Sequence, residues 1–293
     1  MRKFWIFILL LSLLSGCSAQ PESADIAATT LPIYEFTSRL CQGTGLTVTR
    51  LVTESVSCLH DYSLNVRQVR AAEAADVIVI NGAGLEEFME DLLYGADVID
   101  ASQGVHIHEG GHHHEHDAGH TEHDGHNHET DSHIWLSPEN ALVMAQNIAS
   151  GLSARYPEHG EIFENNLTAL LSDINRLQEY ADGQLGSLTC RNLITFHDGF
   201  SYLAESFGLE ILEAVEEESG SEASASELIH LIDIVREHQL PAIFVETNGS
   251  CSAASIISAE TGAEIFTLDM AMSGESWFDA MYHNIDTLKE ALQ

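Results

Sequence analysis

Short apolar runs alternate with amphipathic stretches along the first third of the chain. Runs that fit strands occupy residues 26–31, 46–52, 76–80 and 97–100, and helical patterns lie between them at 32–42, 66–75 and 85–93. Strands that alternate with helices are typical of parallel α/β units, in which each helix connects two neighbouring strands. The pattern therefore predicts an α/β lobe built on a parallel sheet.

The last third of the chain repeats this organisation. Strand patterns occupy residues 188–196, 210–214, 242–245 and 264–268, and helical patterns follow them at 199–207, 224–238, 251–261 and 277–292. The same reasoning predicts a second α/β lobe of similar size. We place the first lobe at residues 26–156 and the second at 187–293.

A long amphipathic stretch separates the two predicted lobes. Its apolar side chains recur at helical spacing and polar residues fill the opposite face; they are Ile162, Phe163, Leu167, Leu170, Leu171, Ile174, Leu177 and Tyr180. A helix of ~25 residues spans about 37 Å at ~1.5 Å per residue. A flexible linker would be rich in Gly and Ser instead. Residues 157–186 are therefore predicted to form a rigid helix that joins the lobes.

The chain begins with a targeting pattern. Arg2 and Lys3 precede an apolar run over residues 4–14, and Leu14-Ser15-Gly16-Cys17 follows. This is typical of a secretory signal peptide, and the run is shorter than the ~20 residues of a transmembrane helix. The tetrapeptide resembles a bacterial lipobox, which implies cleavage after residue 16, lipid attachment to Cys17 and a tether over 17–25. The alternative is a signal anchor that stays attached.

The net charge limits the possible partners. The chain carries 46 acidic and 11 basic residues, for a formal net charge of −35. Nucleic acid is excluded as a partner, because its phosphates require Lys and Arg. A negative surface raises the local concentration of cations, although a diffuse field does not select one metal.

Four cysteines remain if Cys17 is lipidated. An even number in an exported protein permits two disulfides, for which three pairings exist. One possible pairing joins Cys41 to Cys58 and Cys190 to Cys251, within each half of the chain. The spacings do not fit a zinc-knuckle pattern.

One segment differs in composition from the rest of the chain. Residues 104–130 contain ten histidines among Asp, Glu and Gly: His106, His108, His112, His113, His114, His116, His120, His123, His126 and His128. Such a composition cannot bury a core. Imidazole is the commonest ligand for zinc, copper and nickel, so this His-rich segment is predicted to bind several metal ions weakly. A tag or a neutral spacer would not need irregular internal histidines.

A selective metal site needs ligands held on a rigid scaffold. Three other histidines lie at or near the ends of predicted strands or just before a helix: His60, His133 and His197. Asp269 follows the strand at 264–268 in the same way. Ligands of open α/β sheets collect at the carboxyl ends of strands, so we expect these four side chains to form the site.

The motifs around these residues resemble a known family. They are Cys-Leu-His-Asp-Tyr-Ser-Leu at 58–64, Asp-Ser-His-Ile-Trp-Leu-Ser-Pro at 131–138, Phe-His-Asp-Gly-Phe at 196–200, Thr-Thr-Leu-Pro-Ile-Tyr at 29–34 and Leu-Asp-Met at 268–270. They are similar to motifs of the cluster A-I metal-binding proteins, the solute-binding subunits of zinc and manganese ABC importers. The resemblance covers nearly all of the mature chain, with the motifs in the family's order.

The resemblance implies an architecture and a ligand set. The fold would be two (β/α)4-like lobes joined by a single long helix, with the metal in the interlobe cleft. His60 and His133 would come from the first lobe, and His197 and Asp269 from the second. Zinc-binding members of the family have His at the position of His197, and manganese-binding members usually have Glu there. Ligand chemistry agrees, because nitrogen-rich sites favour zinc and oxygen-rich sites suit manganese. Leu59 and Met270 stand where the family usually has Pro, and in some zinc members water or a nearby Glu is the fourth ligand.

The implied partner is the membrane permease of an ABC importer, and the implied protein is a monomer anchored by lipid on the extracytoplasmic face of the cell membrane.

Three alternative functions remain open. A zinc hydrolase would use a metal-activated water, but the chain has no HExxH or nucleophile elbow, and Glu246 is its only obvious candidate base, so we expect no enzyme. The others are a manganese or iron binder of the same fold and a zinc-dependent surface adhesin.

Overall fold

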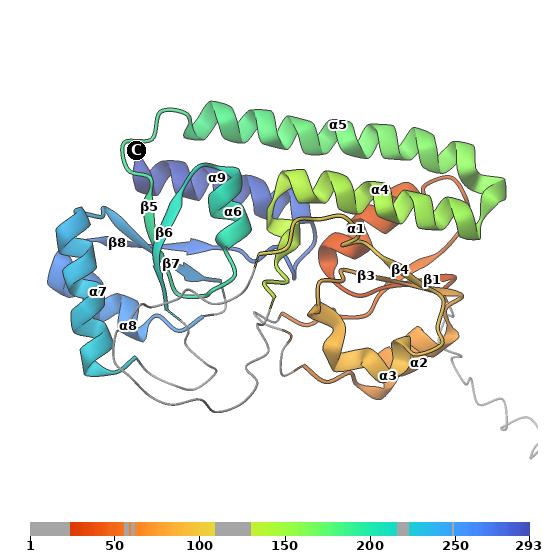
Figure 1. Cartoon of the computed structure of the whole chain (residues 1–293), viewed down its shortest axis with the longest axis horizontal. Helices are drawn as coiled ribbons and strands as arrows, with labels where there is room; N and C mark the ends of the chain where they lie inside the picture. The colour runs from red at the N-terminus through yellow and green to blue at the C-terminus, as the bar shows by residue number, and fades with distance from the viewer. Residues whose placement is uncertain (1–23, 56–58, 60–61, 109–129, 216–222, 248) are drawn as a thin grey trace, which may run out of the picture.

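A computed structural model describes residues 24–55, 59, 62–108, 130–215, 223–247 and 249–293. The two predicted α/β lobes are present, and helix α5 runs along both of them (Figure 1). The predicted signal peptide, the lipobox Cys17 and most of the His-rich segment lie outside the described residues. No helix in these described ranges is long and apolar enough to cross a membrane.

The N-terminal lobe is built on a four-stranded parallel sheet with the order β2-β1-β3-β4. Its strands are β1 (Ile26–Ala28), β2 (Val48–Arg50), β3 (Val77–Ile80) and β4 (Val98–Asp100). Helices α1 (Leu31–Leu40) and α4 (Pro138–Arg155) cover the face toward α5, and α2 (Val66–Ala74) and α3 (Glu90–Leu93) cover the other (Figure 1). Alternate strand residues pack on opposite faces: Val77 and Val79 on one, Ile78 on the other.

The helix predicted at 85–93 is split in the structure. A 3-10 turn, η1 (Leu85–Met89), precedes the single turn of α3. Glu86 has non-helical backbone angles, and its carboxylate accepts hydrogen bonds from the amides of Asn81 and Gly82 just after β3. These bonds pull the start of the segment back toward the strand end, which prevents a continuous helix.

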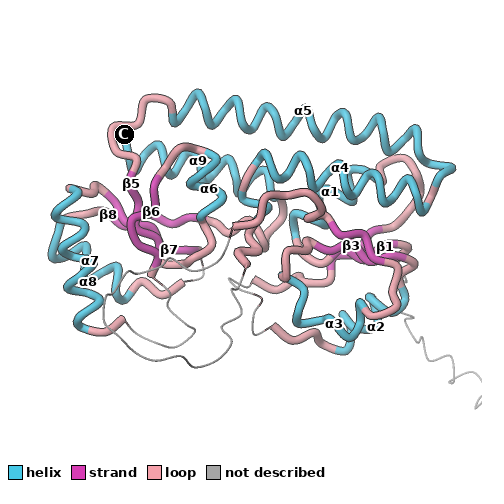
Figure 2. Tube along the Cα trace, viewed as in Figure 1, coloured by secondary structure: helices cyan, strands magenta, loops and turns pink. Residues whose placement is uncertain are grey.

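The C-terminal lobe repeats the design with the strand order β6-β5-β7-β8, again all parallel. Its strands are β5 (Asn192–Thr195), β6 (Glu210–Ala214), β7 (Ala242–Glu246) and β8 (Glu264–Leu268). Helices α6 (Ser201–Ser206) and α9 (Trp277–Leu292) lie toward α5, and α7 (Ala225–His238) and α8 (Ser252–Thr261) lie on the other face (Figure 2). The strand predicted from residue 188 begins later because the amides of Thr189 and Cys190 donate to the Leu292 carbonyl.

Helix α5 (Gly160–Leu185) has 26 residues and joins the lobes, as predicted. Its buried face packs against α1 and α4 of the first lobe and against α9 of the second. One continuous hydrophobic cluster, which includes Phe36 of α1 and Trp277 of α9, extends through both lobes. The Glu35 carboxylate also accepts a hydrogen bond from the Trp277 amide at the start of α9. The lobes are therefore packed together and not merely tethered.

The bridge between Cys190 and Cys251, one of the pairings that the sequence permits, is not formed in the structure, in which both residues are free thiols. Cys190 lies before the amino end of β5 and Cys251 beyond the carboxyl end of β7, so the two are at opposite ends of neighbouring parallel strands. A strand of four to five residues separates such positions by ~13–17 Å, beyond the ~7 Å limit between disulfide Cα atoms. Cys41 is a buried free thiol whose pKa is raised to about 12 by burial, and Cys58 lies outside the described residues.

Gly151 of α4 allows this helix to approach β4 closely. A Cβ atom there would lie 2.7–2.9 Å from three side-chain carbons of Ile99. We expect Gly151→Ala to destabilise the protein by ~1–3 kcal/mol through overpacking. The matched control is Gly183→Ala in α5, where a Cβ meets nothing within 4 Å; it should stabilise by ~0.5–1 kcal/mol. Denaturant unfolding of the metal-free proteins measures both, and equal effects of the two variants would contradict this packing.

Glu86 makes the stability of the first lobe depend on pH. Its buried carboxylate accepts from the Thr29 hydroxyl at 2.7 Å, and burial raises its pKa from 4.5 to about 7 against the effect of its hydrogen bonds. A raised acid pKa contributes stability that is present below about 4.5 and lost as the pH rises through about 7. Relative to Glu86→Gln, the wild type should lose up to ~3 kcal/mol of unfolding free energy over this range. If the unfolding free energies of the metal-free wild type and of Glu86→Gln changed with pH in the same way, this prediction would be refuted.

Candidate metal centre

His133 enters the site from the segment that leads into the 3-10 turn η2 (Ile134–Leu136). Its side chain is buried, with 6% of the residue exposed. Ring atom Nδ1 lies 2.8 Å from Oδ1 of Asp131, which also accepts from the His133 amide at 3.0 Å. A carboxylate can only accept, so Nδ1 donates and the lone pair stays on Nε2. His133 is thus held in the tautomer that presents Nε2 to a metal.

Asp131 stays ionised in spite of its burial. Burial acts to raise its pKa, but the hydrogen bonds that the ring and the amide of His133 donate to it act in the opposite direction, and the net pKa is lowered. The carboxylate is therefore an acceptor at neutral pH. A charged acceptor also makes the imidazole a stronger electron donor to a bound cation.

His197 reaches the same place from the second lobe. It follows β5 by two residues, at the carboxyl end of the sheet. Its Nδ1 lies 3.7 Å from Oε2 of Glu246, the buried last residue of β7. Each lobe thus supplies an imidazole with a carboxylate beside its Nδ1 and with Nε2 pointing away from that carboxylate.

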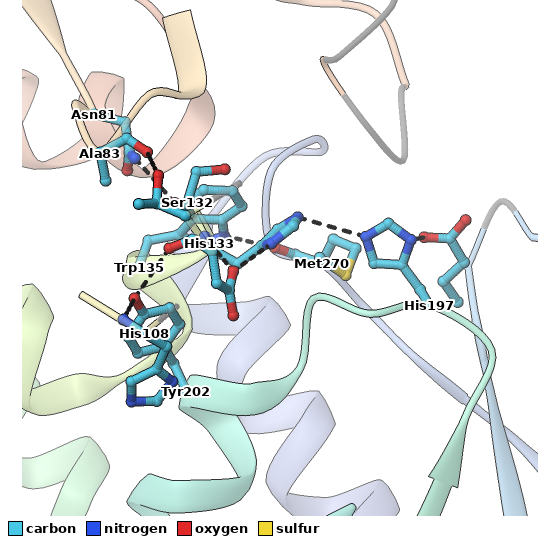
Figure 3. Close-up of polar contacts among 12 residues, drawn as sticks. Asn81, Ala83, His108, Ser132, His133, Trp135, His197, Tyr202 and Met270 are labelled. Atoms are coloured by element: carbon cyan, nitrogen blue, oxygen red, sulfur yellow. Dashed lines mark hydrogen bonds and ion pairs between the residues drawn. The ribbon is translucent and has the colours of Figure 1, made fainter. Parts of the chain in front are cut away.

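The two imidazoles face each other across the lobes. The Nε2 atoms of His133 and His197 are 3.4 Å apart, and the rings are nearly perpendicular, at 89° (Figure 3). Two nitrogens bound tetrahedrally to one zinc ion at ~2.0–2.1 Å are themselves ~3.3–3.4 Å apart. The spacing therefore fits two ligands of one ion.

Two buried tryptophans hold the His133 segment against the second lobe. The indole Nε1 of Trp135 donates to the Met270 carbonyl at 2.7 Å (Figure 3). The indole Nε1 of Trp277 donates to the Trp135 carbonyl at 3.0 Å. Both side chains are fully buried. Both indole N–H groups therefore have a partner, and these two side chains give the site a buried aromatic inner wall.

Asp269 is close in the chain to this wall but is not gathered with the histidines. Its Oδ1 accepts from the Ala271 amide at 2.7 Å, and its own backbone is held by the Asn284 side chain. Ala271 has a φ of +53°, a strained value for a residue with a Cβ. In the described ranges no third His, Cys, Asp or Glu side chain joins His133 and His197 in a group that could hold a metal.

The remaining predicted ligands form two groups, those outside the described residues and those within them. His60 and eight histidines of the His-rich segment lie outside the described residues: His112, His113, His114, His116, His120, His123, His126 and His128. His106 and His108 are described and lie at the C-terminal lobe. His108 stacks on Tyr202 of α6 with ring centroids 4.1 Å apart, and its Nε2 is 2.7 Å from Glu205.

Sequence reasoning missed the roles of Asp131 and Glu246 as partners of the histidines. The signal for Asp131 was present, because an Asp two residues before a His can reach both its amide and its ring, as here. Glu246 gave no local signal, since it is distant from His197 in the chain and meets it only through the pairing of β5 with β7.

Comparisons with known proteins point to one family. The family model described as zinc-uptake complex component A, periplasmic, matches residues 26–291. The zinc-binding lipoprotein AdcA of Streptococcus pneumoniae is 31% identical over 296 residues, an alignment that covers 94% of this chain but only 58% of that protein. The manganese-binding lipoprotein MntA of Halalkalibacterium halodurans is 29% identical over 245 residues, covering 80% and 77%. A crystal structure of ZnuA has 28% identity and a TM-score of 0.78, covering 92% and 100%.

Because Gly199 has no side chain, the ring of His197 can lie directly against it. A Cβ atom there would be 2.6 Å from Cδ2 and 2.8 Å from Nε2 of His197, and 2.8 Å from Cε of Met270. Gly199→Ala should therefore displace the ring and weaken the binding of a divalent ion such as Co²⁺ by at least ~10-fold. The control is Gly160→Ala, where the added Cβ meets nothing. Titration by visible absorbance measures both, and unchanged affinity in Gly199→Ala would show that His197 does not need this position.

Proposed function

Because the chain belongs to the family of zinc-uptake complex component A proteins, we propose that it is the extracytoplasmic zinc-binding subunit of an ABC importer. The observation that carries the proposal is the 3.4 Å separation of the His133 and His197 Nε2 atoms. Each of these rings has a carboxylate at its other nitrogen, which is the usual support of a zinc-bound histidine.

The proposed ligands are His60, His133 and His197, with Asp269 or a water in the fourth position. Leu59, the neighbour of His60, is a core residue with 2% exposure, so the chain is anchored at the residue next to this ligand. Asp269 would have to bind through Oδ2, since its Oδ1 holds the Ala271 amide. Three imidazoles leave a nitrogen-rich site, which favours zinc over manganese.

The proposed location is the outer face of the cell membrane. A signal peptide at 1–16, a lipid on Cys17 and a tether at 17–25 would hold the monomer near its permease. Two relatives, AdcA and MntA, are named lipoproteins, which supports this part of the proposal. The His-rich segment 104–130 would add weak auxiliary metal sites near the cleft.

Binding a zinc ion and passing it to a permease require no catalytic group, and the site supports binding without turnover. A zinc hydrolase would need a general base beside the metal-bound water. Glu246 was the one candidate for that role, and its carboxylate instead lies beside Nδ1 of His197, on the side of the ring away from His133. It supports a ligand and does not face the place where a water would be activated.

Manganese is the second candidate cargo, and its support is the 29% identity to MntA. Manganese prefers oxygen ligands, and the two facing groups here are both imidazoles. A direct competition between the two metals therefore separates the candidates.

The test uses the mature chain with residues 109–129 replaced by a short Gly-Ser linker, which removes the weak sites. The linker can close because the Asp131 amide donates to the His108 carbonyl at 3.1 Å. We expect one tightly bound zinc that excess manganese does not displace. His133→Ala and His197→Ala should each weaken binding by more than the ~10–100-fold typical of a residue that only supports a ligand. His283→Ala on the exposed side of α9 is the control.

Chelator competition and metal analysis give the affinity and the stoichiometry. A protein that binds no zinc tightly after this replacement, or one in which His133→Ala and His197→Ala bind like the His283→Ala control, would overturn the proposed function. Displacement of the zinc by manganese would assign the site to the second candidate.

A further inference from the structure

Tyr202 of α6 joins the second lobe to two chain segments, those at His108 and at Asp131, which we call the stem. Its hydroxyl accepts a hydrogen bond from the His108 amide at 2.9 Å and donates one to the Asp131 carbonyl at 3.0 Å. The stem itself is closed by the bond from the Asp131 amide to the His108 carbonyl. One buried hydroxyl, on a residue with 2% exposure, therefore holds both sides of the stem (Figure 3).

The position of Asp131 decides the orientation of His133. Its main chain is fixed on both sides, at the amide by His108 and at the carbonyl by Tyr202. Its carboxylate is fixed by its two bonds to His133. An Asp side chain is short, so a displacement of the Asp131 backbone moves Oδ1 with it and changes the direction in which His133 presents Nε2.

The same short helix follows the other imidazole. Tyr202 comes five residues after His197, and α6 packs on the η2 turn that follows His133. The aromatic ring of Tyr202 is stacked on His108, with an angle of 9° between the planes, so the hydroxyl has little freedom to leave the stem. Glu205, one turn further on, contacts the same histidine.

We propose that Tyr202 is a positioning residue for the zinc ligand His133 and acts through Asp131. The second lobe then supplies one ligand, His197, and also sets the orientation of a ligand from the first lobe. This inference rests on the proposed function, since it concerns affinity for zinc. It assigns to Tyr202 a purpose beyond filling the core.

The first experiment is Tyr202→Phe in the linker-replaced protein, with zinc affinity and dissociation rate as readouts. Phenylalanine keeps the packed ring and its stack on His108 and removes only the hydroxyl. Zinc affinity should fall roughly tenfold, mainly through faster dissociation, at the low end of the range for groups that support a ligand. The control is Tyr180→Phe, which removes the hydroxyl bonded to Asp286 on the outer surface between α5 and α9 and should change nothing.

A double-mutant cycle tests the route through Asp131. Asp131→Asn should weaken zinc binding by itself, and adding Tyr202→Phe to it should cost less than about twofold more, because coupled residues are not additive. The absorption spectrum of bound Co²⁺ should follow the same pattern. Tyr202→Phe should shift this spectrum in the wild-type background but not in the Asp131→Asn background. A purely structural tyrosine would not alter the ligand spectrum.

Hydrogen exchange in the linker-replaced protein without point substitutions gives a measurement that survives if Tyr202→Phe fails to fold. Coupling is reciprocal, so a stem that favours zinc binding must itself be stabilised by zinc. The His108 amide, whose acceptor is the Tyr202 hydroxyl, should exchange several-fold more slowly in the zinc form. The Gly186 amide, which donates to Asp182 at the far end of α5, should not respond.

The outcomes separate the inference from the function on which it rests. Absence of tight zinc in the parent protein would end the proposed function. Tight zinc with unchanged affinity in Tyr202→Phe, additive effects in the cycle, or zinc-independent exchange at His108 would each overturn the positioning role while the zinc site stands.

Discussion

The separation of two imidazole nitrogens from different lobes is the constraint on which the rest of the structure depends. A pair held 3.4 Å apart fits one ion, and an error of a few tenths of an ångström would spoil the geometry. Such tolerance cannot be met by lobes on a flexible linker. Helix α5, the shared hydrophobic cluster and the bond from Glu35 to the start of α9 supply the necessary rigidity.

Distance alone does not make a ligand, because each ring must also present its lone pair. Asp131 fixes the ring of His133 through a hydrogen bond at 2.8 Å, and Glu246 places a carboxylate 3.7 Å from Nδ1 of His197. The carboxylates differ in origin. Asp131 comes from the same short segment as its histidine, whereas Glu246 comes from the neighbouring strand. One partnership is therefore local, and the other exists only when the second sheet is assembled.

The sequence predicted most of the elements, because these depend on periodicity. Strand β8 and helix α9 have the predicted bounds, and α5 is the long helix that was predicted to join the lobes. Features that depend on tertiary geometry were harder to predict. The sequence left three disulfide pairings open, and strand direction separates Cys190 from Cys251, one of the possible pairs. Asp269 was expected from its place after a strand, and the pattern of residues could not reveal that its Oδ1 also accepts from the Ala271 amide.

The packing of the lobes also limits how a bound ion can leave. Moving the lobes apart would expose Phe36, Trp135 and Trp277, which are fully buried where the lobes meet. At ~1.5–3 kcal/mol for each large apolar side chain, this costs about 5–9 kcal/mol, comparable with the ~5–15 kcal/mol that stabilises an entire domain. The fold therefore opposes release by separation of the lobes. The orientation of the His133 ring depends instead on the single hydroxyl of Tyr202, which ties His108 and Asp131 to the second lobe, so a small displacement there would disturb a ligand without moving the lobes apart.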